Sequence, residues 1–169
     1  MFRWLPQGAN YPPDGPWPGK GRFDTGEHKT LYLAATAEGA MAEFFRRFPE
    51  LLEIQDDLII GFFEVELEVS ADCVDVRTPS GAAVIGIELL RLRSSEPDEL
   101  SRYAECRALA VECITAGFVG LAYPSAASVA ETWNLVLFGE QSEPGWHGLG
   151  YQPVPRPRLT SVDVRSIES

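Results

Sequence analysis

The stretch of residues 21–48, GRFDTGEHKTLYLAATAEGAMAEFFRRF, constrains the fold most, because it contains three kinds of local structure in succession. Prolines and glycines precede it, so it begins in a loop. Residues 31–34, Leu-Tyr-Leu-Ala, form the short apolar run of a buried strand. Residues 37–48 have the apolar spacing of an amphipathic helix, between Thr36 as an N-cap and Pro49. A loop, a strand and a helix in this order can bring their side chains to one cleft.

Glu43 lies at the edge of the apolar face of the predicted helix. At about 100° per residue, it stands about 60° past Ala40, so its carboxylate can reach the lip of a packed surface. The spacing also permits a solvent-facing pair with Arg47 at i, i+4, worth about 0.2–0.5 kcal/mol. Helix spacing alone favours this surface pair, and the cleft position of Glu43 stays the alternative.

The composition predicts a globular protein, and it argues against binding to nucleic acid or to a membrane. The 169 residues fit one domain, and 45% of them are hydrophobic. A net charge of -11 would repel a phosphate backbone, and arginine supplies most of the positive charge. The N-terminal MFRWLPQG lacks the pattern of a signal peptide, and no apolar run reaches the roughly 18 residues of a membrane span. We therefore expect a cytoplasmic protein.

Outside residues 21–48, the first half of the chain is predicted to contain an extended segment, a strand and a turn. Residues 1–20 are rich in proline and glycine, which predicts an extended segment that is neither a helix nor a central strand. Residues 58–76 alternate apolar side chains with glutamates, which predicts one half-buried antiparallel strand with Glu64, Glu66 and Glu68 facing solvent. Residues 78–81 are predicted to form a turn.

The second half combines one long helix with short strands and loops. Apolar side chains from Tyr103 to Ile114 predict a helix over residues 98–116 that ends at Gly117. Residues 117–128 read as a loop that carries Ser125, and residues 133–138 as a short strand. We expect a turn at 145–148, an extended proline-containing segment at 151–158 and a short last strand at 161–165, with residues 82–92 apolar but of uncertain type.

The cysteines and histidines do not form a recognisable site. Cys106 and Cys113 lie seven residues apart on the predicted helix, about 10 Å along its axis, which is too far for a disulfide. A nucleophilic cysteine would need a neighbouring base, and the chain supplies only His28 and His147, so packed, reduced cysteines are favoured. No zinc pattern is present, so no metal is expected. Rossmann and P-loop glycine motifs and the GxSxG elbow are also missing.

Five blocks together resemble the RES domain, a family named for its Arg, Glu and Ser. They are GRFD (21–24), TLYLA (30–34), AMAEFF (40–45), GLAYPSAAS (120–128) and NLVLF (134–138). RES proteins are toxins of toxin–antitoxin systems, with a fold similar to that of ADP-ribosyltransferases and an activity that consumes NAD⁺. The resemblance implies one α+β domain over residues 1–169, with a mixed or antiparallel sheet and flanking helices. It also implies NAD⁺ as a substrate and an antitoxin, expected to be a helix-turn-helix protein, as a partner.

The resemblance implies roles for six residues. Glu43 would stabilise the positive charge that builds on the ribose as nicotinamide leaves. Arg22 would pair with the pyrophosphate, Tyr32 would stack on or hydrogen-bond the nicotinamide ribose, and Ser125 would orient it. Arg3 and Asn134 would add a further pocket arginine and a polar side chain at the start of a strand. From the residues alone, a core tyrosine and a turn-capping serine remain alternatives for Tyr32 and Ser125.

Three functions remain open from the sequence. The first is a toxin that cleaves the nicotinamide–ribose bond of NAD⁺ by hydrolysis or phosphorolysis. The second is an ADP-ribosyltransferase that modifies a protein, since water, phosphate and a side chain would all attack the same cation. The third is a non-catalytic module that uses its acidic strand face to bind a protein partner.

Overall fold

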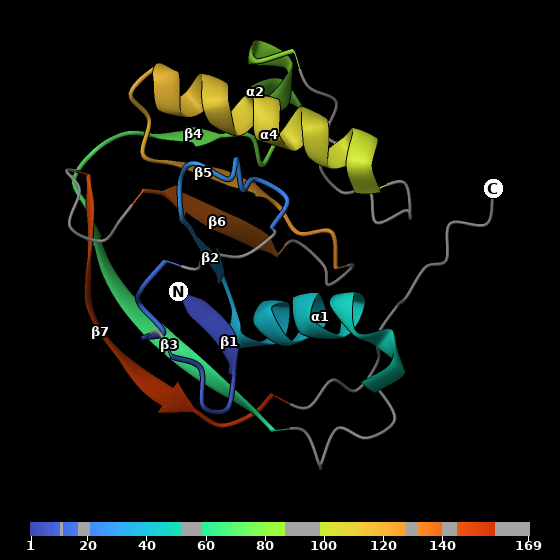
Figure 1. Ribbon diagram of the computed structural model, residues 1–169, viewed down its shortest axis with the longest axis vertical. Helices are drawn as coiled ribbons and strands as arrows, with labels where there is room; N and C mark the ends of the chain where they lie inside the picture. Colours follow the sequence, from blue (N-terminus) through green and yellow to red (C-terminus); the bar gives the residue numbers. More distant parts are fainter. Residues whose placement is uncertain are drawn as a thin grey trace.

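One mixed sheet organises the chain. The computed structural model describes residues 1–10, 12–16, 21–51, 59–86, 99–127, 132–139 and 145–157. Within these residues the strands are β1 (Phe2–Pro6), β2 (Thr30–Ala34), β3 (Ile60–Val69), β4 (Cys73–Asp75), β5 (Gly120–Pro124), β6 (Trp133–Phe138) and β7 (Trp146–Val154). The helices are α1 (Ala37–Arg47), α2 (Pro79–Val84) and α4 (Glu99–Thr115). The strand order is β4-β5-β6-β2-β1-β3-β7, and only the β4–β5 pair among these is parallel (Figure 1).

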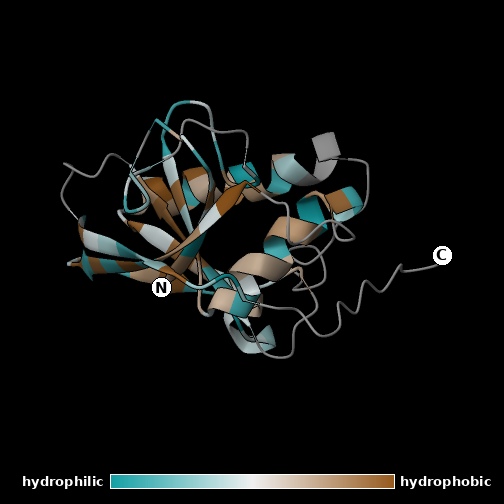
Figure 2. Ribbon diagram, turned by 90° about the horizontal axis from the view of Figure 1, so that it is seen from below, coloured by the Kyte–Doolittle hydropathy of each residue, from teal (hydrophilic) through white to brown (hydrophobic). Residues whose placement is uncertain are grey.

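Helices α1 and α4 pack on the same face of the sheet, over different halves of it. Tyr32 and Ala34 lie two residues apart on β2 and therefore point to the same face. Tyr32 packs against the cluster beneath α4, and Ala34 belongs to the cluster beneath α1. A third cluster, which includes Leu31 and Val65, occupies the opposite face. The central strands are correspondingly hydrophobic, whereas the helices carry both hydrophobic and hydrophilic residues (Figure 2).

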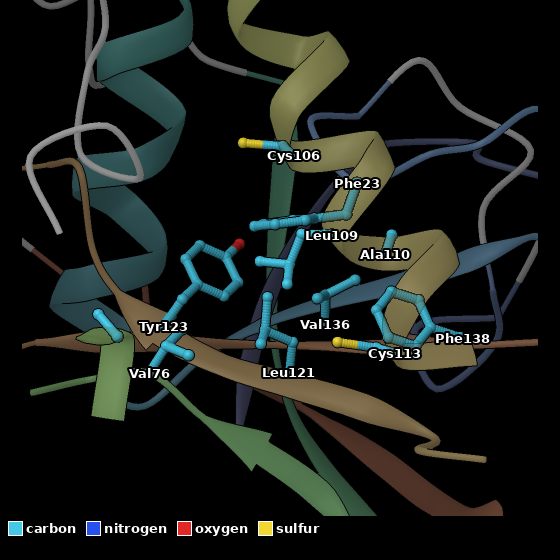
Figure 3. Packing of buried hydrophobic residues seen from close by; sticks show 11 residues of the cluster. Phe23, Val76, Cys106, Leu109, Ala110, Cys113, Leu121, Tyr123, Val136 and Phe138 are labelled. Carbon is cyan, nitrogen blue, oxygen red and sulfur yellow. The ribbon is translucent and has the colours of Figure 1, made fainter. Parts of the chain in front are cut away.

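The long helix packs through the side chains that the sequence indicated. Cys106, Ala110 and Cys113 are buried, and Leu109 joins them. Figure 3 shows these residues of α4 facing the strands, with Val136 among the side chains that they meet. This confirms the predicted face and explains the cysteines as packing residues.

Thr36 caps α1 as predicted. Its Oγ accepts a hydrogen bond from the backbone N–H of Gly39 over 3.0 Å, and the helix ends one residue before Phe48. Replacing an N-cap threonine by alanine leaves one N–H of the first turn without this acceptor. We expect Thr36→Ala to lower the free energy of unfolding by about 1 kcal/mol. Urea denaturation checks this value, and an unchanged midpoint would show that water replaces the cap at no cost.

The prediction for residues 1–20 is wrong at its start. Phe2–Pro6 forms β1, which lies between β2 and β3 and is therefore a central strand. The first proline is only the last residue of this strand, so four residues with alternating burial precede it. The proline-rich part begins further along and did not justify excluding a strand here.

The alternating segment 58–76 forms two strands and not one. The break falls at residues 70–72, after which β4 pairs in parallel with β5 at the far edge of the sheet. The antiparallel prediction is confirmed for β3, which pairs with β1 and β7. Glu66 and Glu68 face solvent as predicted, while Glu64 is half-buried and accepts a hydrogen bond from Gln152 over 2.8 Å.

Three segments predicted as turns or loops belong to regular elements. Thr78 caps α2 through a hydrogen bond from the N–H of Gly81, so residues 78–81 begin a helix. Residues 120–124 are strand β5, fully buried, although they were predicted as loop. Residues 146–148 belong to β7, because they pair with residues 67–69 of β3. The predicted strand 133–138 is confirmed as β6.

Other predictions lie outside the described residues: the start of the long helix at Asp98, the apolar residues 87–92 and the last strand at 161–165. The extended segment is confirmed as far as Val154, the end of β7. Of the helices in the described part of the chain, none has the length and apolar character to span a membrane.

Candidate functional site

Glu43 lies in a cage of hydrogen-bond donors where α1 meets the ends of β5 and β6. Its Oε1 accepts from Ser125 Oγ over 2.7 Å and from Asn134 Nδ2 over 2.8 Å. The backbone N–H groups of Ala126 and Ala127 donate to the same oxygen over 3.2 and 3.5 Å. The Glu43 side chain is only 16% exposed. We call Glu43, Ser125, Ala126, Ala127 and Asn134 the glutamate cage.

The antiparallel pairing of β5 and β6 builds this cage. Asn134 lies opposite Tyr123 in the register, and the N–H of Ser125 donates to the carbonyl oxygen of Thr132 over 3.1 Å. Ser125 therefore follows directly on the strand pair that presents Asn134. Its Oγ also accepts from the N–H of Ala127 over 3.1 Å, so the serine caps its turn and binds Glu43 at the same time. The turn-capping interpretation of Ser125 is confirmed, and its contact with a substrate stays a prediction.

The second oxygen of Glu43 pairs with Arg46, a residue that the sequence did not single out. Arg46 Nε donates to Glu43 Oε2 over 2.9 Å at the i, i+3 spacing. The interpretation of Glu43 as a surface partner of Arg47 is therefore wrong. Spacing allows either neighbour, and the donors that fix Oε1 turn Oε2 towards Arg46.

Arg22 stands near the cage at the end of a loop that Tyr32 holds. The Tyr32 hydroxyl accepts a hydrogen bond from the N–H of Phe23 over 2.9 Å, next to Arg22. A side chain at Gly21 would collide with the Tyr32 ring, so glycine permits this close approach. Arg22 is 9% exposed, and its guanidinium lies over the Tyr123 ring, 5.7 Å from the ring centroid.

The charges around Glu43 keep it ionised. Burial alone would raise the pKa of this carboxyl, but the positive charges of Arg46 and Arg22 and the hydrogen bond from Ser125 outweigh burial and lower the pKa to about 2. Burial raises the pKa of Tyr32, so its hydroxyl stays neutral. The cage therefore presents a fixed negative charge with very little basicity.

This pKa predicts a contribution to acid stability. Because the folded pKa lies below the ordinary value of 4.5, the stabilisation is fully present above pH 4.5 and is lost as the pH falls towards 2. At 1.36 kcal/mol per unit the loss is about 3 kcal/mol. Over this range we expect the unfolding free energy of wild type to fall by about that much more than that of Glu43→Gln, measured by urea denaturation. Parallel curves for the two proteins would contradict the lowered pKa.

Within the described residues, Arg3 binds backbone carbonyl groups of the N-terminal segment. Its Nη1 donates to the carbonyl oxygens of Pro13, over 2.9 Å, and Gly15. Its neighbours on β1, Phe2 and Trp4, pack with the cluster beneath α1, so strand alternation directs Arg3 to the other face of the sheet. Arg3 anchors the N-terminal segment, and its place in a dinucleotide pocket stays a prediction.

Asn134 carries a buried acceptor beside Glu43. Its Nδ2 serves the cage, while its Oδ1 is buried and meets no hydrogen-bond donor among the described residues. The reverse orientation would place Oδ1 against the Glu43 carboxylate, which fixes the amide as described. A ligand hydroxyl that reached this position would satisfy the acceptor.

Neither the buried cysteines nor a hollow on the sheet belongs to the glutamate cage. Burial raises the pKa of Cys106 and raises that of Cys113 to about 11, so both thiols are protonated at neutral pH. A hollow of about 630 Å³ is lined largely by β3 and β7, including Val65, Leu67 and Tyr151, and by no residue of the glutamate cage. Among the described residues, no three metal-binding side chains come together.

Fold and site together define a class: an α+β protein with a mixed sheet, two helices on one face, and a caged, ionised glutamate at the ends of two adjacent strands. The chain belongs to the RES domain family, which matches residues 2–150. This confirms the family resemblance seen in the sequence.

A solved structure shows the same fold. A chain in the crystal structure of the M. tuberculosis MbcT–MbcA toxin–antitoxin complex matches with a TM-score of 0.58 and 16% sequence identity, covering 90% of this chain and 82% of that chain. The match confirms the predicted α+β class. A search of curated proteins finds no match.

Proposed function

We propose that this chain is an NAD⁺-consuming toxin of a toxin–antitoxin system, which cleaves the bond between nicotinamide and ribose. The observation that carries the proposal is the glutamate cage, which holds one carboxylate ionised with a pKa of about 2. Membership of the RES family and the likeness of the fold to a toxin–antitoxin structure support it.

The chemistry of this bond suits such a carboxylate. When the C1′–N bond breaks, its electron pair stays on the pyridine nitrogen, nicotinamide leaves as a neutral molecule, and the positive charge moves to the ribose. A nearby negative charge that is already ionised and held rigidly stabilises this cation without reorganising. Its low basicity indicates an electrostatic role for Glu43, because a carboxylate with a pKa of about 2 accepts a proton poorly at neutral pH.

The other site residues orient this charge and the substrate. Ser125 and Asn134 fix Oε1, and Asn134 Oδ1, which meets no donor within the part of the chain that the structure describes, offers an acceptor for a ribose hydroxyl. Tyr32 holds the loop that carries Arg22, whose positive charge faces the pyrophosphate in this proposal. The bound substrate would thus lie with its anionic part towards the loop and its ribose towards the cage.

The acceptor of the ADP-ribosyl cation distinguishes three outcomes. Attack by water gives ADP-ribose with release of a proton, attack by phosphate gives ADP-ribose 1-phosphate, and attack by a side chain gives a modified protein. Because Glu43 is a weak base, it would activate neither water nor a protein hydroxyl strongly, whereas phosphate is already an anion and needs no such activation.

A cognate antitoxin is part of the proposal. The similar solved structure is a toxin–antitoxin complex, and at a net charge of -11 this chain suits a more basic partner, such as a helix-turn-helix protein. A toxin that depletes NAD⁺ must be kept inactive in the cytoplasm, where both proteins would meet.

The proposal is tested by incubating the purified chain, free of any partner, with NAD⁺ in buffers with and without phosphate. We expect release of nicotinamide, with the label of [adenine-¹⁴C]NAD⁺ recovered in small molecules. Label on protein would assign the transferase reaction. No nicotinamide from a folded protein in either buffer would reject the catalytic proposal and favour a binding module.

A further inference from the structure

Arg46 presents a cation beside Glu43 that the reaction above leaves unused. Only its Nε takes part in the pair with Glu43 Oε2, and the side chain is 27% exposed. Among the described residues, its two terminal nitrogens make no hydrogen bond. The guanidinium therefore keeps a planar pair of donors for a ligand, next to the proposed reaction centre.

We propose that Arg46 binds a phosphate of the dinucleotide substrate through its terminal nitrogens while its Nε holds Glu43. This inference rests on the proposed function, because it assumes that the ligand of the site is a nucleoside diphosphate ribose. It gives Arg46 two tasks: it orients the carboxylate and it fixes the distance between the phosphate and the cleaved bond.

The charge at the site supports an anionic ligand in an acidic chain. Arg46 and Arg22 both act on Glu43, so two guanidinium groups accompany one carboxylate and leave a local positive charge. This contrasts with the net charge of -11 for the whole chain. An anion is therefore drawn to this position and repelled by the remaining surface.

The other arginines predicted for the pocket are placed differently. Arg22 is 9% exposed and lies over the ring of Tyr123, so little of its side chain reaches solvent. Arg3 binds the carbonyl oxygens of Pro13 and Gly15 with Nη1. Arg46 combines proximity to Glu43 with a partly exposed side chain, and a diphosphate is commonly held by more than one charged donor.

Arg47 provides a matched control on the same helix. It carries the same charge one residue further on, about 100° around the helix axis, and is exposed. Its guanidinium lies over the Phe48 ring, 5.7 Å from the centroid, and not on Glu43. Changing either arginine to glutamine alters the net charge equally, so only the position differs.

The test measures the affinity for ADP-ribose by isothermal titration calorimetry with wild type, Arg46→Gln, Arg46→Lys and Arg47→Gln. We expect Arg46→Gln to weaken binding about 10- to 100-fold, as for the loss of charge-assisted hydrogen bonds. Arg47→Gln should weaken it less than about threefold. Arg46→Lys keeps the charge but not the fork, so its affinity should fall between these two. If Arg46→Gln does not fold, the ADP-ribose affinities of Arg46→Lys and Arg47→Gln are compared instead to test the inference.

Kinetics on NAD⁺ separate the two tasks of Arg46. A raised KM together with weaker ADP-ribose binding supports a phosphate contact. A lower kcat with unchanged ADP-ribose affinity overturns the inference, because Arg46 would then only orient Glu43. Equal weakening of ADP-ribose binding by the Arg46 and Arg47 variants also overturns it. Wild type that binds ADP-ribose in an Arg46-dependent way but releases no nicotinamide refutes the proposed reaction alone. Wild type that does not bind ADP-ribose overturns the anion site.

Discussion

Glu43→Gln is expected to lower kcat/KM for NAD⁺ cleavage by about 10²- to 10³-fold, the range seen when one preorganised electrostatic group is removed from an active site. The amide oxygen of glutamine can still accept from Ser125 and Asn134 at the position of Oε1. Its nitrogen would then face the Nε–H of Arg46, donor against donor. The substitution therefore removes the negative charge and breaks the pair with Arg46, while most of the cage remains.

The glutamine variant should remain folded, with a loss of unfolding free energy of about 1–3 kcal/mol for the unpaired Arg46 donor. Circular dichroism and urea denaturation separate this loss from the loss of activity. Glu66→Gln is the control, because Glu66 is an exposed carboxylate on β3 and the change of charge is the same. Equal activity of the Glu43 and Glu66 variants would refute the assignment of the reaction to the cage.

Arg22→Ala is expected to lower kcat/KM by about 10²-fold, for two reasons. The variant loses the charge proposed to face the pyrophosphate, and it loses one of the two cations that lower the pKa of Glu43. Nicotinamide release measured over a range of NAD⁺ concentrations should show a raised KM with a reduced kcat. The pKa of Glu43 should rise relative to wild type, which NMR titration of the carboxyl would detect.

Removing Arg22 also removes packing on Tyr123, since the guanidinium lies 5.7 Å from the centroid of that ring. Arg22→Lys keeps a positive charge but loses the planar fork, so it separates charge from geometry. We expect the lysine variant to recover the low pKa of Glu43 and only part of the activity. Full activity of the folded alanine variant would exclude Arg22 from the site.

The helix α1 could be predicted from sequence because its determinants are local. Thr36, the phenylalanine face and Pro49 lie within one short stretch, and each acts through a known preference. The same holds for the packed face of α4. Helix spacing nevertheless predicts Arg47 as the partner of Glu43, whereas the observed partner is Arg46. The preference between the i+3 and the i+4 residue depends on contacts from outside the helix.

The cage could not be derived from spacing. Its contacts join Glu43 to Ser125 and Asn134 across 82 and 91 residues, and such contacts depend on how β5 and β6 pair. The resemblance to the RES family supplied the residue set. It did not supply Arg46 or the backbone donors of Ala126 and Ala127.

Strand assignments failed where pairing partners decide the structure. The proline and glycine content of residues 1–20 predicts an extended segment without a central strand, although Phe2–Pro6 alternates in burial and forms β1. Pro124 and Ser125 predict a loop for β5, yet β4 and β6 pair with it on both sides and all its residues are buried. In both cases non-local hydrogen bonding outweighed the local turn residues.

A crystal structure of the chain with ADP-ribose bound is the most direct test of the site. We expect the ribose C1′ beside Glu43, with a ribose hydroxyl within hydrogen-bond distance of Asn134 Oδ1 and the diphosphate between Arg22 and Arg46. ADP-ribose bound instead in the hollow between β3 and β7, with the glutamate cage empty, would contradict it.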